Sequence, residues 1–206
     1  MRLPDFFGAV APLRLRDPLA AFLGAAEDGI VEYRYADVVK LAGHSCPTVA
    51  GAFGMARAAL AALYGNELPH RGEIAVAFRE PADAGVTGVT ANVVSMITGA
   101  AGEGGFKGLG GRFARRNLLS FGAPLRLDIR LSRLDSGAAV EAAADLRAVP
   151  ADPELPALMQ NAVLGTASAA EMARFGALWQ DRVRRILLEH LDDPAVFIVQ
   201  PAEGAS

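Results

Sequence analysis

The sequence is poor in cysteine, in lysine and in net charge of either sign. Its 206 residues include one cysteine, so no disulfide can form within the chain, as expected in a reducing cytoplasm. Only Lys40 and Lys107 are lysines and the net charge is −3, which leaves no basic field to attract nucleic acid or an acidic membrane surface. No apolar run reaches membrane-span length, and the first residues lack the unbroken apolar core of a signal peptide. These absences predict a cytoplasmic protein with neither nucleic acid nor membrane as a partner.

What is abundant is apolar material. Hydrophobic residues make up 52% of the chain, enough for one sizeable core. We therefore expect residues 1–206 to form a single domain. Its core should span about residues 35–150, and a C-terminal helical part about residues 152–192.

The most informative stretch places the only cysteine two residues after one of three histidines. His44 and Cys46 precede Pro47, and apolar residues then recur every three or four positions as far as Leu63. The pattern predicts a helix over residues 47–64 with Cys46 at its N-cap, because proline suits the first helical turn. A thiol at that position faces unpaired backbone N–H groups, which favour the thiolate. With the imidazole it offers two ligands for a divalent metal, zinc being the first candidate.

Two other interpretations of the pair stay open. A lone cysteine is commonly a small buried hydrophobe, and a lone histidine is often satisfied by hydrogen bonds. Cys46 could also act as a thiol nucleophile. Two ligands do not complete a zinc site, which needs three or four.

Residues 43–47 (Gly-His-Ser-Cys-Pro), with Gly51 and Met55-Ala56 after them, resemble the opening motif of the FmdE family, the E-subunit-like proteins of formylmethanofuran dehydrogenase. Residues 92–104, around Thr98-Gly99, resemble that family's later glycine-rich segment. The resemblance covers about residues 35–185. It implies an FmdE-like fold, a metal at His44 and Cys46, and a one-carbon or pterin-like ligand.

The chain departs from the family pattern at several positions. Where relatives carry a cysteine, an aspartate and a second cysteine around the Thr-Gly, this sequence has Val89, Asn92 and Ala100. A single cysteine also excludes the C-terminal four-cysteine zinc ribbon of many relatives. Any metal must therefore complete its coordination with water, substrate or other side chains.

Several polar residues are candidates for those replacement ligands or for contacts with a bound molecule. They are Thr48, Glu80, Asp83, Asn92, Thr98, Glu103 and Lys107. For Glu80 and Asp83, which follow a predicted strand over residues 73–79, a turn with solvated acids is the preferred alternative. Asp37 could reach the same cavity, although a helix-capping role is the preferred interpretation.

A glycine-rich loop and a cationic cluster follow. The loop over residues 99–111 could present backbone N–H groups to an anion, but a flexible lid or a tight packing turn explains its glycines equally well. Residues 112–117 contain three arginines. They could clamp a carboxylate or phosphate, although solvated surface is the commoner role of such clusters.

The remaining pattern sets the fold class. Residues 4–18 read as an irregular lead-in. Residues 125–132 alternate apolar and polar and return over residues 138–144 as a hairpin. Helices are expected over residues 153–164 and from the capping box at Ser168 to about residue 190. We predict an α+β fold with a mixed or mainly antiparallel sheet packed against helices. The His44–Cys46 pair should face the loop over residues 99–111 across a pocket.

The leading functional hypothesis is an FmdE-like metal-binding protein acting on or binding a small ligand that the sequence does not identify. If it is an enzyme, which the sequence leaves open, the metal's open positions would polarise a carbonyl or activate water. The alternative is a non-catalytic accessory or ligand-binding module in which His44 and Cys46 are structural. The apolar stripe of the last long helix indicates core packing or a homodimer.

Overall fold

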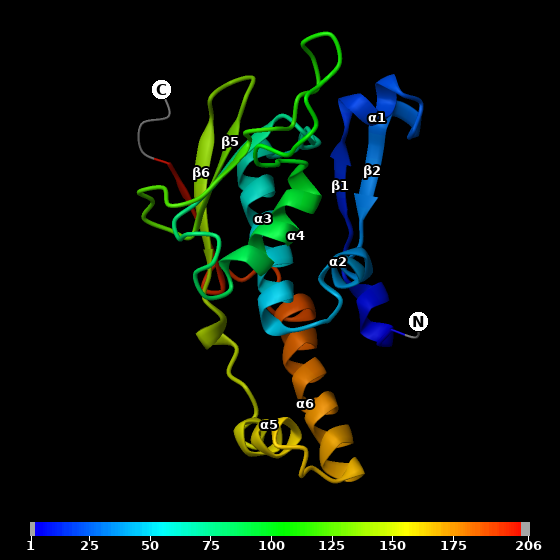
Figure 1. Ribbon diagram of the computed structural model, residues 1–206, viewed down its shortest axis with the longest axis vertical. Helices are drawn as coiled ribbons and strands as arrows, with labels where there is room; N and C mark the ends of the chain where they lie inside the picture. Colours follow the sequence, from blue (N-terminus) through cyan, green and yellow to red (C-terminus); the bar gives the residue numbers. More distant parts are fainter. Residues whose placement is uncertain (1–2, 203–206) are drawn as a thin grey trace.

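The computed structural model describes residues 3–202 and has an α+β fold built on a five-stranded mixed sheet (Figure 1). The strand order is β4-β3-β5-β6-β7; β3 and β4 are parallel, and the other neighbours are antiparallel. The strands are β3 (Ile74–Phe78), β4 (Leu119–Ser120), β5 (Ile129–Arg133), β6 (Ala139–Ala144) and β7 (Phe197–Pro201). A separate antiparallel pair consists of β1 (Leu13–Arg16) and β2 (Ile30–Tyr33). The predicted fold class is confirmed.

Three of the α-helices begin at capping residues that are recognisable in the sequence. The α-helices are α1 (Pro18–Phe22), α2 (Tyr35–Ala42), α3 (Pro47–Tyr64), α4 (Thr87–Thr98), α5 (Leu155–Val163) and α6 (Ala169–Leu188). Three short 3-10 helices are η1 (Asp5–Ala9), η2 (Glu27–Gly29) and η3 (Leu146–Ala148). The N-caps Asp17, Cys46 and Ser168 each accept a backbone N–H through the side chain, as capping residues do.

Helix α3 is the centre of the molecule. Twelve of its 18 residues are buried, and it packs against β5, β6 and β7 on one side and against α2, α4 and α6 on others. At Gly54 the ring of Phe197 from β7 comes so close that a Cβ atom would overlap it. Glycine in this helix thus lets the sheet approach the helix backbone.

Two predictions about the strands are wrong. Residues 4–18 are not an irregular lead-in, because they contain η1 and strand β1. The strand predicted from residue 125 begins only at Ile129, since the buried Glu141 carboxylate accepts the N–H groups of Arg126 (2.9 Å) and Leu127 (3.1 Å). The Glu141 carboxylate therefore bonds backbone N–H groups that a neighbouring strand would otherwise bond.

A buried ion cluster ties the first helix to the glycine-rich loop. Asp17, 3% exposed, accepts hydrogen bonds from Arg71 Nη1 (2.8 Å) and Arg115 Nη2 (2.6 and 2.7 Å). Burial alone would raise the pKa of Asp17, but the hydrogen bonds from Arg71, the Ala20 backbone and Arg115 outweigh it and hold the pKa below its ordinary value. The predicted cationic cluster thus contributes Arg115 to an internal ion pair.

The glycines of the loop are explained by tight packing. At Gly105 an added Cβ would lie 2.8 Å from the Arg116 Cα, and at Gly108 it would overlap the carbonyl oxygen of Arg112. The chain also folds back on itself, because Arg115 donates its N–H to the Phe106 carbonyl at 2.8 Å. The packing-turn interpretation therefore accounts for these two glycines.

Helices α5 and α6 form a hairpin that points away from the sheet (Figure 1). The second half of α6 buries Val183, Ile186 and Leu187 against the core. Its first half packs on α5 and leaves Met172 47% exposed. The apolar stripe predicted for this helix is therefore core at one end only.

Candidate functional site

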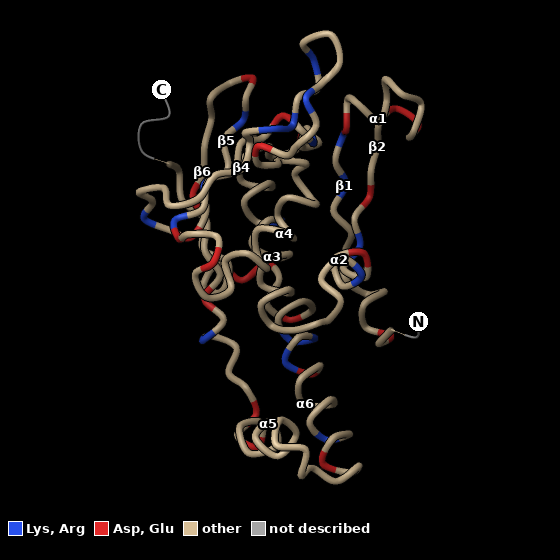
Figure 2. Tube along the Cα trace, viewed as in Figure 1, with Lys and Arg blue, Asp and Glu red and all other residues tan. Residues whose placement is uncertain are grey.

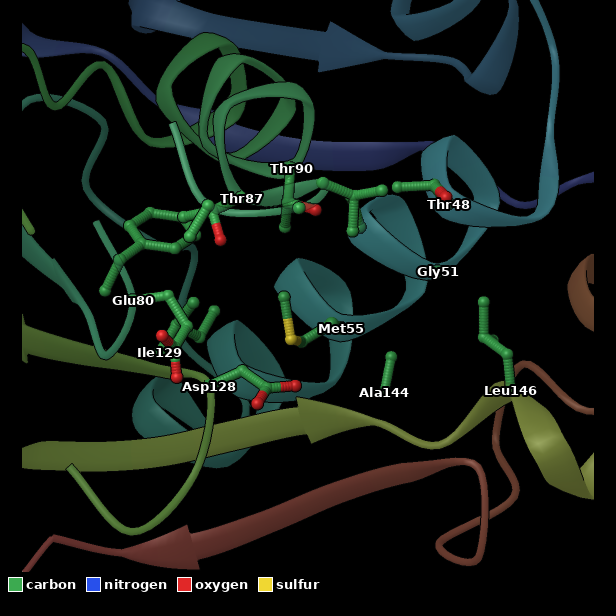
Figure 3. Close-up of a pocket in the computed structure, with 15 residues that line it drawn as sticks. Thr48, Gly51, Met55, Glu80, Thr87, Thr90, Asp128, Ile129, Ala144 and Leu146 are labelled. Atoms are coloured by element: carbon green, nitrogen blue, oxygen red, sulfur yellow. The ribbon is translucent and has the colours of Figure 1, made fainter. Parts of the chain in front are cut away.

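A cavity of about 450 Å³ lies between the starts of α3 and α4 and the sheet. Its polar lining comes from Thr48, Thr87, Thr90, Glu80 and Asp128 (Figure 3). The remaining lining residues are apolar or small: Gly51, Ala52, Met55, Phe78, Ala84, Gly85, Val86, Ile129, Ala144 and Leu146. An apolar cavity of this size with a few converging polar groups is the usual form of a small-molecule site.

Three elements bring the polar groups together. Thr48 lies in the first turn of α3, and Thr87 and Thr90 lie one turn apart at the start of α4. Within the described residues none of these three hydroxyls makes a hydrogen bond to another part of the chain, so each can bond a ligand. Helix α4 also starts without a side-chain cap at Val86, which leaves N–H groups of its first turn available.

Two carboxylates, Glu80 and Asp128, line the cavity, and the Arg79 guanidinium bonds both of them. Glu80 follows β3 and Asp128 precedes β5. Because these two strands pair antiparallel, with Phe78 opposite Ile129, both carboxylates lie at the same end of the strand pair. Arg79 donates to both, from Nε to Glu80 at 3.2 Å and from Nη2 to Asp128 at 2.9 Å. The three side chains together carry one net negative charge.

His44 and Cys46 do not line this cavity. The exposed His44 ring has Nδ1 2.9 Å from the Ala42 carbonyl oxygen. Cys46 is 8% exposed, and its sulfur accepts the Val49 N–H at 3.4 Å. Thr48, two residues further along, connects this segment to the cavity.

Helix α6 holds Ser45, the residue between His44 and Cys46, in place. The Ser45 carbonyl accepts hydrogen bonds from Trp179 Nε1 and Gln180 Nε2, both at 3.1 Å. Its hydroxyl donates to Gln180 Oε1 and lies 3.0 Å from the Tyr35 hydroxyl. The backbone carrying His44 and Cys46 is therefore held rigidly against two helices.

These donors do not by themselves form a complete metal site. Among residues 3–202 no group of three or more His, Cys, Asp or Glu side chains is arranged to hold a metal ion. Zinc takes four protein ligands in structural sites and three in catalytic ones. A metal at His44 and Cys46 would need its other ligands from water or a bound molecule.

The other candidate residues are scattered. Asp83 is exposed in the turn before α4 and Asn92 is exposed on that helix. Buried Thr98 bonds the Val94 carbonyl at the end of α4, and Glu103 and Lys107 are exposed on the glycine-rich loop. Of the seven candidates beyond His44 and Cys46, only Thr48 and Glu80 line the cavity.

The expectation that His44 and Cys46 face the glycine-rich loop is wrong. Thr48 and Thr87 line one cavity, so α3 and α4 start at the same end and run in the same direction (Figure 1). The loop follows the far end of α4. The 18 residues of α3 separate the two places by about 27 Å at 1.5 Å per residue.

Sequence reasoning missed Thr87, Thr90 and Asp128. The alternating pattern predicts Asp128 as a strand residue on the polar face, whereas it precedes β5 and reaches the cavity edge. The two threonines offered a weak signal, since hydroxyls one turn apart at a helix start lie on one face.

Comparison with protein-family models and with curated proteins gives no match for this chain. Across residues 3–202, none of the helices combines the length and the apolar character that a membrane crossing requires. Neither comparison shows a family for this chain, so a relation to the FmdE family stays a hypothesis.

Proposed function

We propose that this protein binds a small molecule in the cavity between the starts of α3 and α4. The observation that carries the proposal is the set of three hydroxyls, on Thr48, Thr87 and Thr90, that line an apolar cavity of about 450 Å³ without a partner in the described chain. Hydroxyls that serve only folding usually bond nearby backbone, whereas these are left for a ligand or water.

The lining indicates the chemistry of the ligand. Met55, Phe78 and Ile129 favour an apolar or planar body. Glu80 and Asp128 accept hydrogen bonds and together outweigh the charge of Arg79, which favours a neutral or cationic edge carrying N–H groups. A pterin-like heterocycle, the class implied by the FmdE resemblance, meets both requirements.

Isothermal titration calorimetry with pterin and a set of small heterocyclic amines tests the proposal. We expect saturable binding to the wild type that Thr48→Val or Thr90→Val each weakens about three- to tenfold, the effect of one lost hydrogen bond. Thr166→Val is the matched control because its hydroxyl bonds the Asn161 carbonyl on the distant helical hairpin. Binding unchanged in both cavity variants, or binding by no member of the set, would contradict the proposal.

A divalent metal at His44 and Cys46 is the second candidate. The contact between His44 Nδ1 and the Ala42 carbonyl favours it, because metal-binding histidines commonly donate one ring N–H to a carbonyl and bind through the other nitrogen. If a metal binds His44 and Cys46, water or the bound molecule completes its coordination. Zinc is the metal to test first.

Elemental analysis of protein purified without a metal-affinity tag decides this second candidate. It predicts bound zinc in the wild type and its loss in both His44→Ala and Cys46→Ser. His70→Ala is the control, since His70 is a partly exposed histidine away from the His44–Cys46 segment, paired with Glu73 at 3.0 Å. Wild-type protein without metal after incubation with zinc and desalting would exclude the metal, and the cavity proposal would be unaffected.

A further inference from the structure

A second cavity, of about 200 Å³, lies where α1 meets the loop that returns from the glycine-rich segment, and we call it the α1 cavity. Its charged lining residues are Arg71, Arg115 and Glu73, and its apolar walls include Leu19, Phe113 and Leu134. The N–H of Gly72, another lining residue, bonds the Thr98 carbonyl at 2.7 Å at the end of α4. The α1 cavity is therefore at the opposite end of α4 from the first cavity, and the two share no lining residue.

The arginines of the α1 cavity carry more charge than the carboxylate that binds them. The side chains of Arg71 and Arg115 are each 15% exposed, and both bond the buried Asp17. Within residues 3–202 neither guanidinium bonds any other carboxylate. Two positive charges thus face one negative charge in a largely buried cluster. Such an excess charge is costly unless a counter-ion pairs with it.

The unused hydrogen-bonding capacity belongs to Arg115. Arg71 donates from Nε and Nη2 to the Met96 carbonyl and from Nη1 to Asp17, so all three of its nitrogens are bonded. Arg115 bonds Asp17 through Nη2 alone, which leaves the N–H groups of Nε and Nη1 without an acceptor in the described chain. These N–H groups need an acceptor that the described chain does not supply, either water or a bound ligand.

Neither free nitrogen of Arg115 is sealed inside the protein. Among the buried and half-buried residues from 3 to 202, Arg130 Nε is the one side-chain polar atom that is shielded from solvent without a partner. Since Arg115 also lines the α1 cavity, a molecule in that cavity can reach its N–H groups.

The loop beside the α1 cavity attracts anions. Residues 104–127 contain one lysine and four arginines but no acidic residue, and Figure 2 shows the basic residues (blue) along the loop next to α1. A surface of one charge sign steers ligands of the opposite sign toward it.

The remaining lining residues indicate the class of anion. Glu73 bonds His70 at 3.0 Å and its side chain is 43% exposed, so a doubly charged phosphate would be repelled more strongly than a single carboxylate. The walls formed by Leu19, Phe113 and Leu134 favour an apolar body next to the charged group. A dry cavity of about 150 Å³ can hold benzene, so a cavity of about 200 Å³ suits a molecule of the size of benzoate.

We propose that the α1 cavity binds a small organic monocarboxylate. The carboxylate accepts the N–H groups of Arg115 that the described chain leaves free and balances the excess charge of the arginine pair. The apolar part of the ligand packs on Phe113 and Leu134. This site is independent of the first cavity and of any metal.

Isothermal titration calorimetry of the full chain with benzoate at low ionic strength tests the proposal. We expect one saturable site with a dissociation constant of about 1 mM or lower, as a charge-assisted hydrogen bond and an apolar contact together provide. Benzamide, which has the same shape without the charge, should bind about tenfold more weakly.

Three variants test the residues of the site. Arg115→Lys keeps a positive charge beside Asp17 but removes Nε and Nη1, and it should weaken benzoate binding about tenfold. Glu73→Gln removes the acid from the lining and should tighten binding about threefold. Leu134→Asp, at a 52% exposed position, adds an acid and should weaken binding about threefold.

Two control variants separate this site from other effects. Val163→Asp makes the same change in net charge as Leu134→Asp at an 82% exposed position on the distant helical hairpin, and it should leave benzoate affinity unchanged. Thr48→Val alters the first cavity and should also leave benzoate affinity unchanged.

Any of three results would overturn the proposal. The first is the absence of saturable binding up to about 10 mM benzoate. The second is an affinity for benzoate that Glu73→Gln and Leu134→Asp both leave unchanged, or that benzamide equals. The third is inorganic phosphate binding more tightly than benzoate, which would contradict the assignment to a monocarboxylate.

Discussion

Asp17 should be a costly acidic residue to neutralise in this protein. It is 3% exposed and accepts hydrogen bonds from two arginines, Arg71 and Arg115, whose side chains are each 15% exposed. It also caps α1, since its Oδ1 accepts the N–H groups of Leu19 and Ala20. Replacing it leaves two largely buried guanidinium groups without their carboxylate.

The magnitude follows from these contacts. Removing one partner of a buried ion pair costs about 3–5 kcal/mol, and loss of an N-cap costs about 1 kcal/mol. Asp17→Asn keeps an oxygen for the cap and Arg71 keeps its bonds to the Met96 carbonyl, so we expect a loss of about 3 kcal/mol. Asp17→Ala loses the cap as well and should lose about 4 kcal/mol.

Urea unfolding at pH 7, followed by circular dichroism, measures both variants. Glu154→Gln is the control because it breaks an exposed pair with Arg174 and should leave the unfolding midpoint close to that of the wild type. A loss below about 1 kcal/mol for Asp17→Asn would refute the reasoning, since that is the range of surface pairs.

The pH dependence of the same variant provides a check on sign. The pKa of Asp17 in the folded protein is lowered below its ordinary 3.8. The stability that ionised Asp17 contributes to the fold is therefore fully present above pH 3.8, and it is lost as the pH falls through the lowered pKa of the folded protein. The stability difference between wild type and Asp17→Asn should therefore stay constant from neutral pH down to about pH 4 and narrow below it. A difference that widened on acidification would contradict the assignment.

Four further predictions concern packing, helix capping and side-chain exposure. Gly54→Ala should destabilise by about 2 kcal/mol because its Cβ overlaps the buried Phe197 ring, whereas Gly176→Ala, with nothing within 4 Å, should stabilise by up to about 1 kcal/mol. Ser168→Ala should cost about 1 kcal/mol through loss of the α6 cap, which urea unfolding would detect. Cys46, at 8% exposure, should react slowly with iodoacetamide until urea is added, and rapid labelling of the native protein would show that its sulfur is accessible.

The sequence is a good guide wherever a structural signal is local. Helix starts at Asp17-Pro18, Cys46-Pro47 and Ser168 are recognisable because the cap and its target N–H groups lie within three residues of each other. Strand β1 was missed because its pairing with β2 depends on residues up to 20 positions away, Leu13 with Tyr33 for example. The prediction that β5 begins at residue 125 was wrong for a similar reason. Glu141, on the next strand β6, accepts the backbone N–H groups of Arg126 and Leu127.

The cavity could be predicted only in part. Thr48 and Glu80 are candidates from the sequence because they lie beside the His-Cys motif and after a clear strand, respectively. Thr87, Thr90 and Asp128 become part of the same site only when α4 and β5 are placed in space. Their roles depend on which helix start lies beside which strand end, and no spacing along the chain encodes that.

The direction of the helices decides where a ligand can bind. β3 ends at Phe78 where α3 and α4 both begin, so the cavity combines the carboxyl end of a strand with the amino ends of two helices. Ligands in α/β proteins favour this combination, because helix starts offer unpaired N–H groups and loops at strand ends can vary without disturbing the core. The glycine-rich loop lies at the opposite end, where several of its backbone groups bond within the loop or to residues 112–119. Substitutions at Glu103 or Lys107 should therefore leave ligand affinity unchanged, and an effect there equal to that of Thr48→Val would place the binding site at the wrong end of α3.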